Sequence, residues 1–284
     1  MSQVEVVYRG DMRVFFLGTG AAEGIPALFC DCSICTFAKQ SGGKERRTRS
    51  TILIDGNIKI DLPPETLAHV HHYPQLDFAN LQHLLFTHSH DDHFAVRELQ
   101  YLSPNFAPSR KSPLHVYATN QLIYKIVSET EGFFERAPLM LQSLMPFFEH
   151  EVGTVSVIPI IANHKRDELC LNFLISSEGK TLLYACDTGW YDPQTWEYLS
   201  TRTLDAVILE CGKGVSHSSY EGHLSVDEAI RVRDRLLDEG TLRPNAPFYL
   251  THIAHTGLLS HEEMEKLVIP CGLKVAYDGL EIQI

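Results

Sequence analysis

Residues 87–93 have the sequence THSHDDH, which gathers three imidazoles and two carboxylates in one short segment. The run His83–Thr87 predicts a buried strand, and Asp92–Leu102 predicts a helix with an acidic first turn. A loop between strand and helix lies at the carboxyl edge of a sheet, where α/β proteins usually bind ligands. Uncompensated polar groups beside an apolar strand are costly, so the segment favours a metal site over a solvated turn.

The remaining pattern alternates strands and helices without a repeat or an evident linker, which favours one domain over all 284 residues. Gly56-Asn57 predicts a hairpin turn. The polar segment Glu65–Tyr73 predicts a helix with His69, His71 and His72 at the surface. The other predicted strands are Arg13–Leu17, Thr51–Asp55, Ile58–Asp61, Leu114–Ala118, Val155–Ile161, Leu171–Ser177, Thr181–Ala185, Leu204–Leu209 and Pro247–Leu250. The other predicted helices are Asn120–Glu131 and Ser225–Glu239, and Ser225 can cap the second of them.

Composition limits the partners. The net charge of −12 disfavours a broad electrostatic grip on nucleic acid and suits a small substrate. No apolar run approaches the roughly 20 residues of a membrane span, and residues 1–20 lack the pattern of an export signal. We therefore expect a cytoplasmic protein with reduced thiols. A homodimer is compatible with the sequence, which does not decide the oligomeric state.

HSHDDH resembles the His-x-His-x-Asp-His motif of the metallo-β-lactamase superfamily. The family's remaining ligands have counterparts in the same order at His164, Asp187 and His252, each a short way beyond an apolar run that predicts a strand, so all could converge on one sheet edge. Taken singly, His164 could be a satisfied polar residue and Asp187 a turn or cap residue. The resemblance implies an α/β fold, the αββα four-layer sandwich of two mixed sheets flanked by helices. It also implies two divalent metal ions, zinc or manganese, that activate a water molecule for hydrolysis. One ion would be held by His88, His90 and His164, the other by Asp92, His93 and His252, with Asp187 bridging both.

The segment CDCSIC, residues 30–35, supplies three thiols near the N-terminus. They could bind a structural zinc but leave a tetrahedral site one ligand short; metal-free thiols are the alternative. The chain also resembles the PhnP-like phosphoribosyl cyclic phosphate phosphodiesterases, and this resemblance implies His255 as the fourth ligand beside Cys30, Cys32 and Cys35. The remaining cysteines lie in or beside apolar runs and predict core positions: Cys170, Cys186, Cys211 and Cys271.

Other polar residues have two interpretations each. The same resemblance implies catalytic roles for Asp92 and for His223, which would contact phosphate or protonate the leaving oxygen; His223 could instead be a loop residue beside a helix cap. The loop Gly18-Thr19-Gly20 could bind an anion or form a tight turn. Arginines follow the cysteine segment, and we expect them to be exposed solubilising charge rather than a phosphate site: Arg46, Arg47 and Arg49.

The function that these resemblances imply is hydrolysis of a small cyclic phosphate ester, phosphoribosyl or nucleotide-like. Two alternatives stay open. A tRNase Z-like nuclease shares the ligand set, but the acidic chain lacks a recognisable basic arm for RNA. A PqqB-like cofactor-pathway protein shares the cysteine-rich zinc site, but the chain carries a complete second set of metal ligands.

Overall fold

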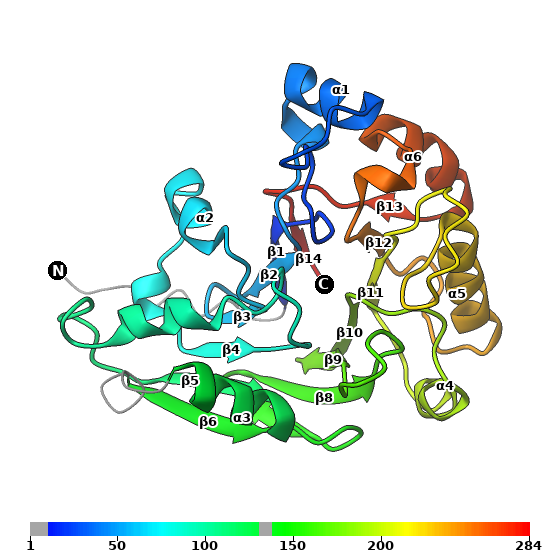
Figure 1. The fold of residues 1–284 in the computed structure, drawn as a ribbon. Coiled ribbons are helices and arrows are strands. Elements are labelled where there is room, and N and C mark those ends of the chain that lie inside the picture. Colours follow the sequence, from blue (N-terminus) through cyan, green and yellow to red (C-terminus); the bar gives the residue numbers. More distant parts are fainter. Residues whose placement is uncertain (1–10, 131–137) are drawn as a thin grey trace, which may run out of the picture.

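The computed structural model describes residues 11–130 and 138–284. Two mixed sheets of seven strands each pack face to face, and helices cover their outer faces (Figure 1). This arrangement is the αββα sandwich that the sequence predicted. Within the described residues, no helix is long and apolar enough to cross a membrane.

The strands divide evenly between the two sheets. The first sheet contains β1 (Arg13–Gly18), β2 (Thr51–Ile54), β3 (Ile58–Ile60), β4 (His83–Leu85), β5 (Leu114–Ala118), β6 (Leu139–Ser143) and β14 (Glu281–Gln283). The second contains β7 (His150–Val152), β8 (Val155–Ile161), β9 (Leu171–Ser177), β10 (Lys180–Ala185), β11 (Ala206–Glu210), β12 (Phe248–Thr251) and β13 (Lys274–Val275). The helices are α1 (Ser33–Ser41), α2 (Thr66–His72), α3 (Asn120–Glu129), α4 (Pro193–Ser200), α5 (Val226–Asp238) and α6 (His261–Val268).

The strand orders are β14-β1-β2-β3-β4-β5-β6 and β13-β12-β11-β10-β9-β8-β7. In the first sheet β3, β4, β5 and β6 run parallel, and in the second β10, β11, β12 and β13 do so. The hairpin turn lies where Gly56-Asn57 predicted it, between the antiparallel strands β2 and β3. Each sheet therefore has a group of parallel strands whose carboxyl ends share an edge.

Buried apolar side chains fill the spaces between the layers. Phe16 of the first sheet and Phe173 of the second belong to the core between the sheets. Helices α4, α5 and α6 share a core with the outer face of the second sheet, and Val232 and Leu250 belong to it. Helix α3 packs on the first sheet through residues such as Leu122. These packed layers hold both sheet edges in fixed positions.

Helix α5 illustrates why the sequence forms these elements. Ser225 accepts a hydrogen bond from the Glu228 N–H while the Glu228 carboxylate accepts one from the Ser225 N–H, so the predicted cap is a complete capping box. The buried positions Val226, Ala229 and Val232 recur at helical spacing.

Two sequence predictions reach beyond the described residues. The predicted helix Asn120–Glu131 ends at Glu129, with Thr130 as its cap residue, and Glu131 lies outside the described residues. Residues 1–10, which form half of the segment without an export-signal pattern, also lie outside them.

The predicted helix Asp92–Leu102 is wrong in its first half. His93 donates its N–H to the His90 carbonyl in a turn, and a 3₁₀ helix starts only at Val96. Leu62 explains the difference, because its N–H donates to the His93 carbonyl and its carbonyl accepts from Ala95. These bonds occupy backbone groups that a helix would need.

Two surface predictions are also wrong. His69 is buried on α2 and hydrogen-bonded to Thr48, whereas His71 and His72 are exposed as predicted. Arg47 is buried as well, and its guanidinium contacts Thr19, the Ala276 carbonyl and His261. Both side chains fasten the segment after the cysteines to neighbouring parts of the fold, a role that periodicity does not reveal.

Candidate metal centre

The structure brings all the predicted ligands of the two-metal site into one cluster at the carboxyl ends of the strands. Asp187 lies at its centre, 2% exposed, directly beyond β10. Burial acts to raise the pKa of its carboxyl, but the neighbouring His252 and His93 outweigh burial and hold it well below its ordinary value. A charged carboxylate is therefore available to two groups of imidazoles at once.

The first group contains His88, His90, His164 and Asp187, each offering one ligand atom within 4.8 Å of the others. His164 Nε2 lies 3.0 Å from His90 Nδ1 and 3.4 Å from Asp187 Oδ2. His88 Nε2 lies 3.3 Å from the same carboxylate oxygen. These residues come from the loop after β4, the end of β8 and the end of β10, as the sequence predicted.

The second group contacts both carboxylate oxygens of Asp187. His252 Nε2 lies 2.7 Å from Asp187 Oδ1 and 3.7 Å from Asp92 Oδ2. His93 Nε2 lies 3.0 Å from Asp92 Oδ2 and 3.3 Å from Asp187 Oδ2. The Cys186 sulfur also lies within 4.8 Å of ligand atoms of His93, Asp187 and His252. Burial raises the pKa of this thiol well above the ordinary value, and Cys186 is buried as predicted.

Asp187 and His252 share an unusual backbone conformation. Each has a φ of 56°, in the left-handed region that non-glycine residues rarely adopt. Such conformations cost on the order of 1–3 kcal/mol each and concentrate at functional sites. Here both occur directly after a strand, where the chain must turn a ligand toward the shared centre.

Acceptors behind the imidazoles orient the rings. His93 Nδ1 lies 2.7 Å from Asp61 Oδ2, and Asp61 also accepts hydrogen bonds from the Thr87 N–H and hydroxyl. His164 Nδ1 donates to the Gly222 carbonyl at 2.8 Å. Bonds of this kind fix the tautomer of a metal-binding histidine. Asp61 was predicted only as the end of a strand, without a role at the site.

His223 lies against this cluster, paired with the fully buried Glu210. Its Nδ1 is 3.5 Å from Glu210 Oε2, and its ring stacks on His252 with centroids 5.2 Å apart. Burial acts to lower the pKa of His223, but the negative charge of Glu210 outweighs it and raises the pKa. Glu210 was not predicted as a site residue, and its only signal in the sequence was its place at the end of an apolar strand.

A cavity of about 340 Å³ opens over the cluster. His90, Asp92 and His223 reach it together with His164, Asp187 and His252, whereas His88 and His93 lie behind the wall. The rest of the lining includes small residues of the loop after β1 and polar residues of the segment 212–220. This size suits a small substrate more than a folded polymer.

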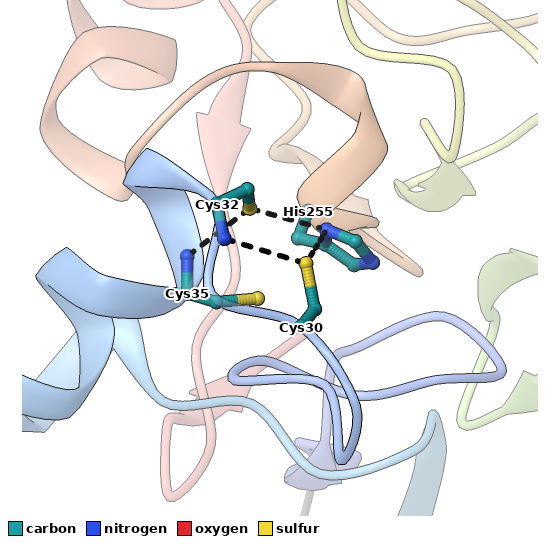
Figure 2. A group of neighbouring side chains, drawn as sticks. All are labelled: Cys30, Cys32, Cys35 and His255. Carbon is teal, nitrogen blue, oxygen red and sulfur yellow. Dashed lines mark hydrogen bonds between the residues drawn. The ribbon is translucent and has the colours of Figure 1, made fainter.

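A second cluster contains Cys30, Cys32, Cys35 and His255, with one ligand atom of each within 4.8 Å of the others. Figure 2 shows their sulfur atoms and the imidazole pointing toward one another. His255 Nδ1 lies 3.4 Å from the Cys32 sulfur and 3.7 Å from the Cys30 sulfur. The predicted fourth ligand thus stands where a Cys3His zinc site needs it.

The thiols differ in their surroundings. The Cys35 N–H donates to the Cys32 sulfur and lowers the pKa of Cys32 to about 6, with His255 adding to the effect, whereas burial raises the pKa of Cys35 to about 11. All the cysteines are free thiols. Of the four predicted core cysteines three are buried and Cys271 is partly exposed.

The glycine loop and the arginines have structural partners. The Gly20 N–H donates to the Thr48 carbonyl, and a Cβ at Gly18 would stand 2.0 Å from the Arg49 carbonyl oxygen. Close packing of two chain segments therefore explains these glycines. Arg46 donates to carbonyls at the end of α1, and Arg49 pairs with Glu65.

Comparisons with known proteins agree with this geometry. The family model described as "Beta-lactamase superfamily domain" matches residues 50–253. The octanoyltransferase of Porphyromonas gingivalis is 25% identical over 285 residues, which cover 95% of this chain and 51% of that protein. The chain therefore spans about half the length of this relative.

Two solved structures are similar over nearly the whole chain. One is a diphosphatase from the PhnP family, with a TM-score of 0.77 at 21% identity, covering 97% of this chain and 98% of that one. The other is zinc-bound PqqB from Methylobacterium extorquens, with a TM-score of 0.76 at 20% identity, covering 96% and 100%. At these identities the likeness establishes the fold.

Proposed function

The chain belongs to the β-lactamase superfamily, and on this premise we propose that it is a metal-dependent phosphodiesterase acting on small cyclic phosphate esters, phosphoribosyl or nucleotide-like. The observation that carries the proposal is the pair of ligand groups sharing Asp187 beside the His223–Glu210 pair, all facing one small cavity. Two cations at adjacent positions and a nearby acid suit in-line displacement at phosphorus.

The chemistry of the donors fits divalent metal ions. His88 Nε2, His93 Nε2 and His252 Nε2 are buried and have no hydrogen-bond partner in the described part of the chain. Burying imidazole nitrogens without a hydrogen-bond partner among carboxylates costs folding free energy, unless a bound cation coordinates the nitrogen lone pairs and the carboxylates. His88, His90 and His164 would hold one ion and Asp92, His93 and His252 the other, with Asp187 shared. Bound there, zinc or manganese would lower the pKa of a water molecule and polarise the phosphate.

In this proposal His223 acts as the general acid. Its ring reaches the cavity, and the charge of Glu210 raises its pKa and so favours the protonated form. Glu210 is itself held by the Gly212 and Leu224 N–H groups, so the pair is rigid. His223 would protonate the leaving oxygen as the phosphorus–oxygen bond breaks.

The dependence of the hydrolysis rate on the leaving group distinguishes a general-acid role of His223 from a structural role. The His223→Ala variant should lose about 10²- to 10⁴-fold in kcat for a diester that releases an alkoxide. It should lose little for a p-nitrophenyl diester, whose leaving group needs no proton. His217→Ala is the matched control, because His217 is exposed on the same loop. Equal losses for both leaving groups would remove the acid role from His223.

A substrate panel tests the reaction class. We expect the metal-loaded protein to hydrolyse cyclic phosphodiesters faster than a diphosphate or precursor tRNA. Elemental analysis should find three ions per chain. Failure to cleave any phosphodiester would refute the proposal, as would faster processing of the tRNA. A single zinc per chain would favour a PqqB-like role instead.

A further inference from the structure

A second, larger cavity of about 840 Å³ adjoins the active cavity. It lies beside α4, α5 and the segment 213–221, and the two cavities share Lys213, Ser218 and Tyr220 in their linings. We call it the α4–α5 cleft. A substrate whose phosphate sits at the metal centre could extend into this cleft without crossing the core.

We propose that the α4–α5 cleft binds the alcohol part of the substrate, and that this part is a neutral, hydroxyl-bearing ring such as a nucleoside, not a group carrying a second phosphate. The proposal rests on the proposed function, because it assigns the rest of the same phosphodiester. It also favours the nucleotide-like substrate over the phosphoribosyl one.

Tyr220 stands where the two cavities meet. Its hydroxyl donates to the His164 carbonyl at 3.1 Å, and its ring lies 5.3 Å from that of His223. The side chain is 47% exposed, so one part of the ring remains accessible. A ring held in this way offers a surface on which a sugar or base can stack as it enters the cleft.

The charges of the cleft disfavour a second phosphate. Five carboxylate side chains line it against two cationic ones: Asp192, Glu197, Glu221, Glu228 and Glu239 against Lys213 and Arg235. Both cations are already paired, Lys213 with Glu228 at 2.7 Å and Arg235 with Glu239 at 2.8 Å. An excess of acceptors favours a ligand that donates hydrogen bonds, as hydroxyl and amino groups do.

The aromatic part of the lining supports a ring-shaped ligand. Trp190 and Trp196 both line the cleft, with Arg231 stacked over the first and Arg235 over the second. Trp196 is 2% exposed, and its Nε1 has no hydrogen-bond partner in the described part of the chain. Contact with a ligand therefore falls to Trp190, which is half-buried and offers an apolar ring surface.

Tryptophan fluorescence tests the cleft independently of catalysis. The chain has two tryptophans, and both line the cleft, so their emission reports on this place alone. We expect adenosine to change the emission saturably and ribose 5-phosphate to bind at least tenfold more weakly. Ribose 5-phosphate binding as tightly as adenosine, or no response to either ligand, would overturn the proposal.

A charge reversal gives the second test. Glu197→Lys should raise the Kd for adenosine and the KM for a 2′,3′-cyclic nucleotide about fivefold or more and improve binding of ribose 5-phosphate. Glu262→Lys makes the same charge change on α6, where the side chain is 72% exposed and outside the cleft, and should alter none of these values.

The two proposals fail in different ways. Adenosine binding without hydrolysis of any diester would refute the phosphodiesterase and leave the cleft as a nucleoside site. The other outcome is hydrolysis of diesters together with tryptophan emission that does not respond to adenosine and an unchanged KM in Glu197→Lys. It would refute only the proposal that the α4–α5 cleft binds the alcohol part of the substrate.

Discussion

Asp187 offers one oxygen to His252 and the other to three further imidazoles, and this sharing makes it the central residue of the candidate metal centre. Asp187→Asn keeps the shape but removes the charge that would bridge two cations. We expect this variant to lose both ions of the centre while keeping the ion of the cysteine cluster, so that elemental analysis falls from three metals to one per chain. Asp205→Asn, in an ion pair with the exposed Arg243, is the control and should keep three. Three ions in Asp187→Asn would contradict the shared role.

The resemblance to the family motif predicted the side chains that meet at this centre. Their places after apolar strands explain why they meet, because strand ends share a sheet edge. The sequence did not predict Asp61 or Glu210. Each binds a site histidine that is 32 or 13 positions away in the chain. Only the fold brings such pairs together, and a lone acidic residue at a strand end carries no sign of its partner.

At the scale of the element, His69 attaches helix α2 to the rest of the fold. The sequence had predicted a surface position for this residue. His69 contacts the Thr48 hydroxyl at 2.8 Å, and burial lowers its pKa to about 3. The unfolded chain has a histidine pKa of about 6.5, so acid protonates His69 in the unfolded state first and lowers stability as the pH falls from about 6.5 toward 3.

We therefore expect His69→Gln to reduce the pH dependence of stability. Between pH 7 and pH 5 the wild type should lose about 2 kcal/mol of unfolding free energy through this group, and the variant should lose correspondingly less. Urea unfolding at both pH values measures the difference. His72→Gln, on the exposed side of the same helix, should follow the wild type. Parallel behaviour of His69→Gln and wild type would show that His69 does not titrate in this way.

Periodicity predicted the strands of the central sheets closely, with β5, β8 and β9 matching residue for residue. It failed where polar contacts replace periodic burial. Asp92–Ala95 forms a turn and a bridge to Leu62 instead of a helix, and the short edge strands β7 and β14 carry too few apolar positions to stand out. Backbone pairing with distant segments determined the conformation there.

At the scale of the whole molecule, the cysteine cluster joins distant parts of the chain. Cys32 caps α1 near the N-terminus, while His255 lies shortly beyond β12 and the predicted ligand His252. His255 Nε2 also lies 3.4 Å from Glu23, which lines the active cavity. A zinc ion in the cluster would close a long loop and hold one wall of the cavity in place.

The Cys32→Ser variant distinguishes the effect of a zinc ion in the cysteine cluster from the effect of the helix cap at Cys32. Serine is a preferred N-cap residue, so without a metal the variant should be as stable as the wild type or slightly more so. If the cluster holds zinc, we expect the variant to lose one zinc per chain and its Tm to fall by roughly 5–10 °C, for about 3 kcal/mol of lost stability. Cys271→Ser, a thiol outside the cluster, should change neither value. An unchanged Tm and zinc content in Cys32→Ser would mean that the thiols meet without a metal and that packing alone joins the two ends.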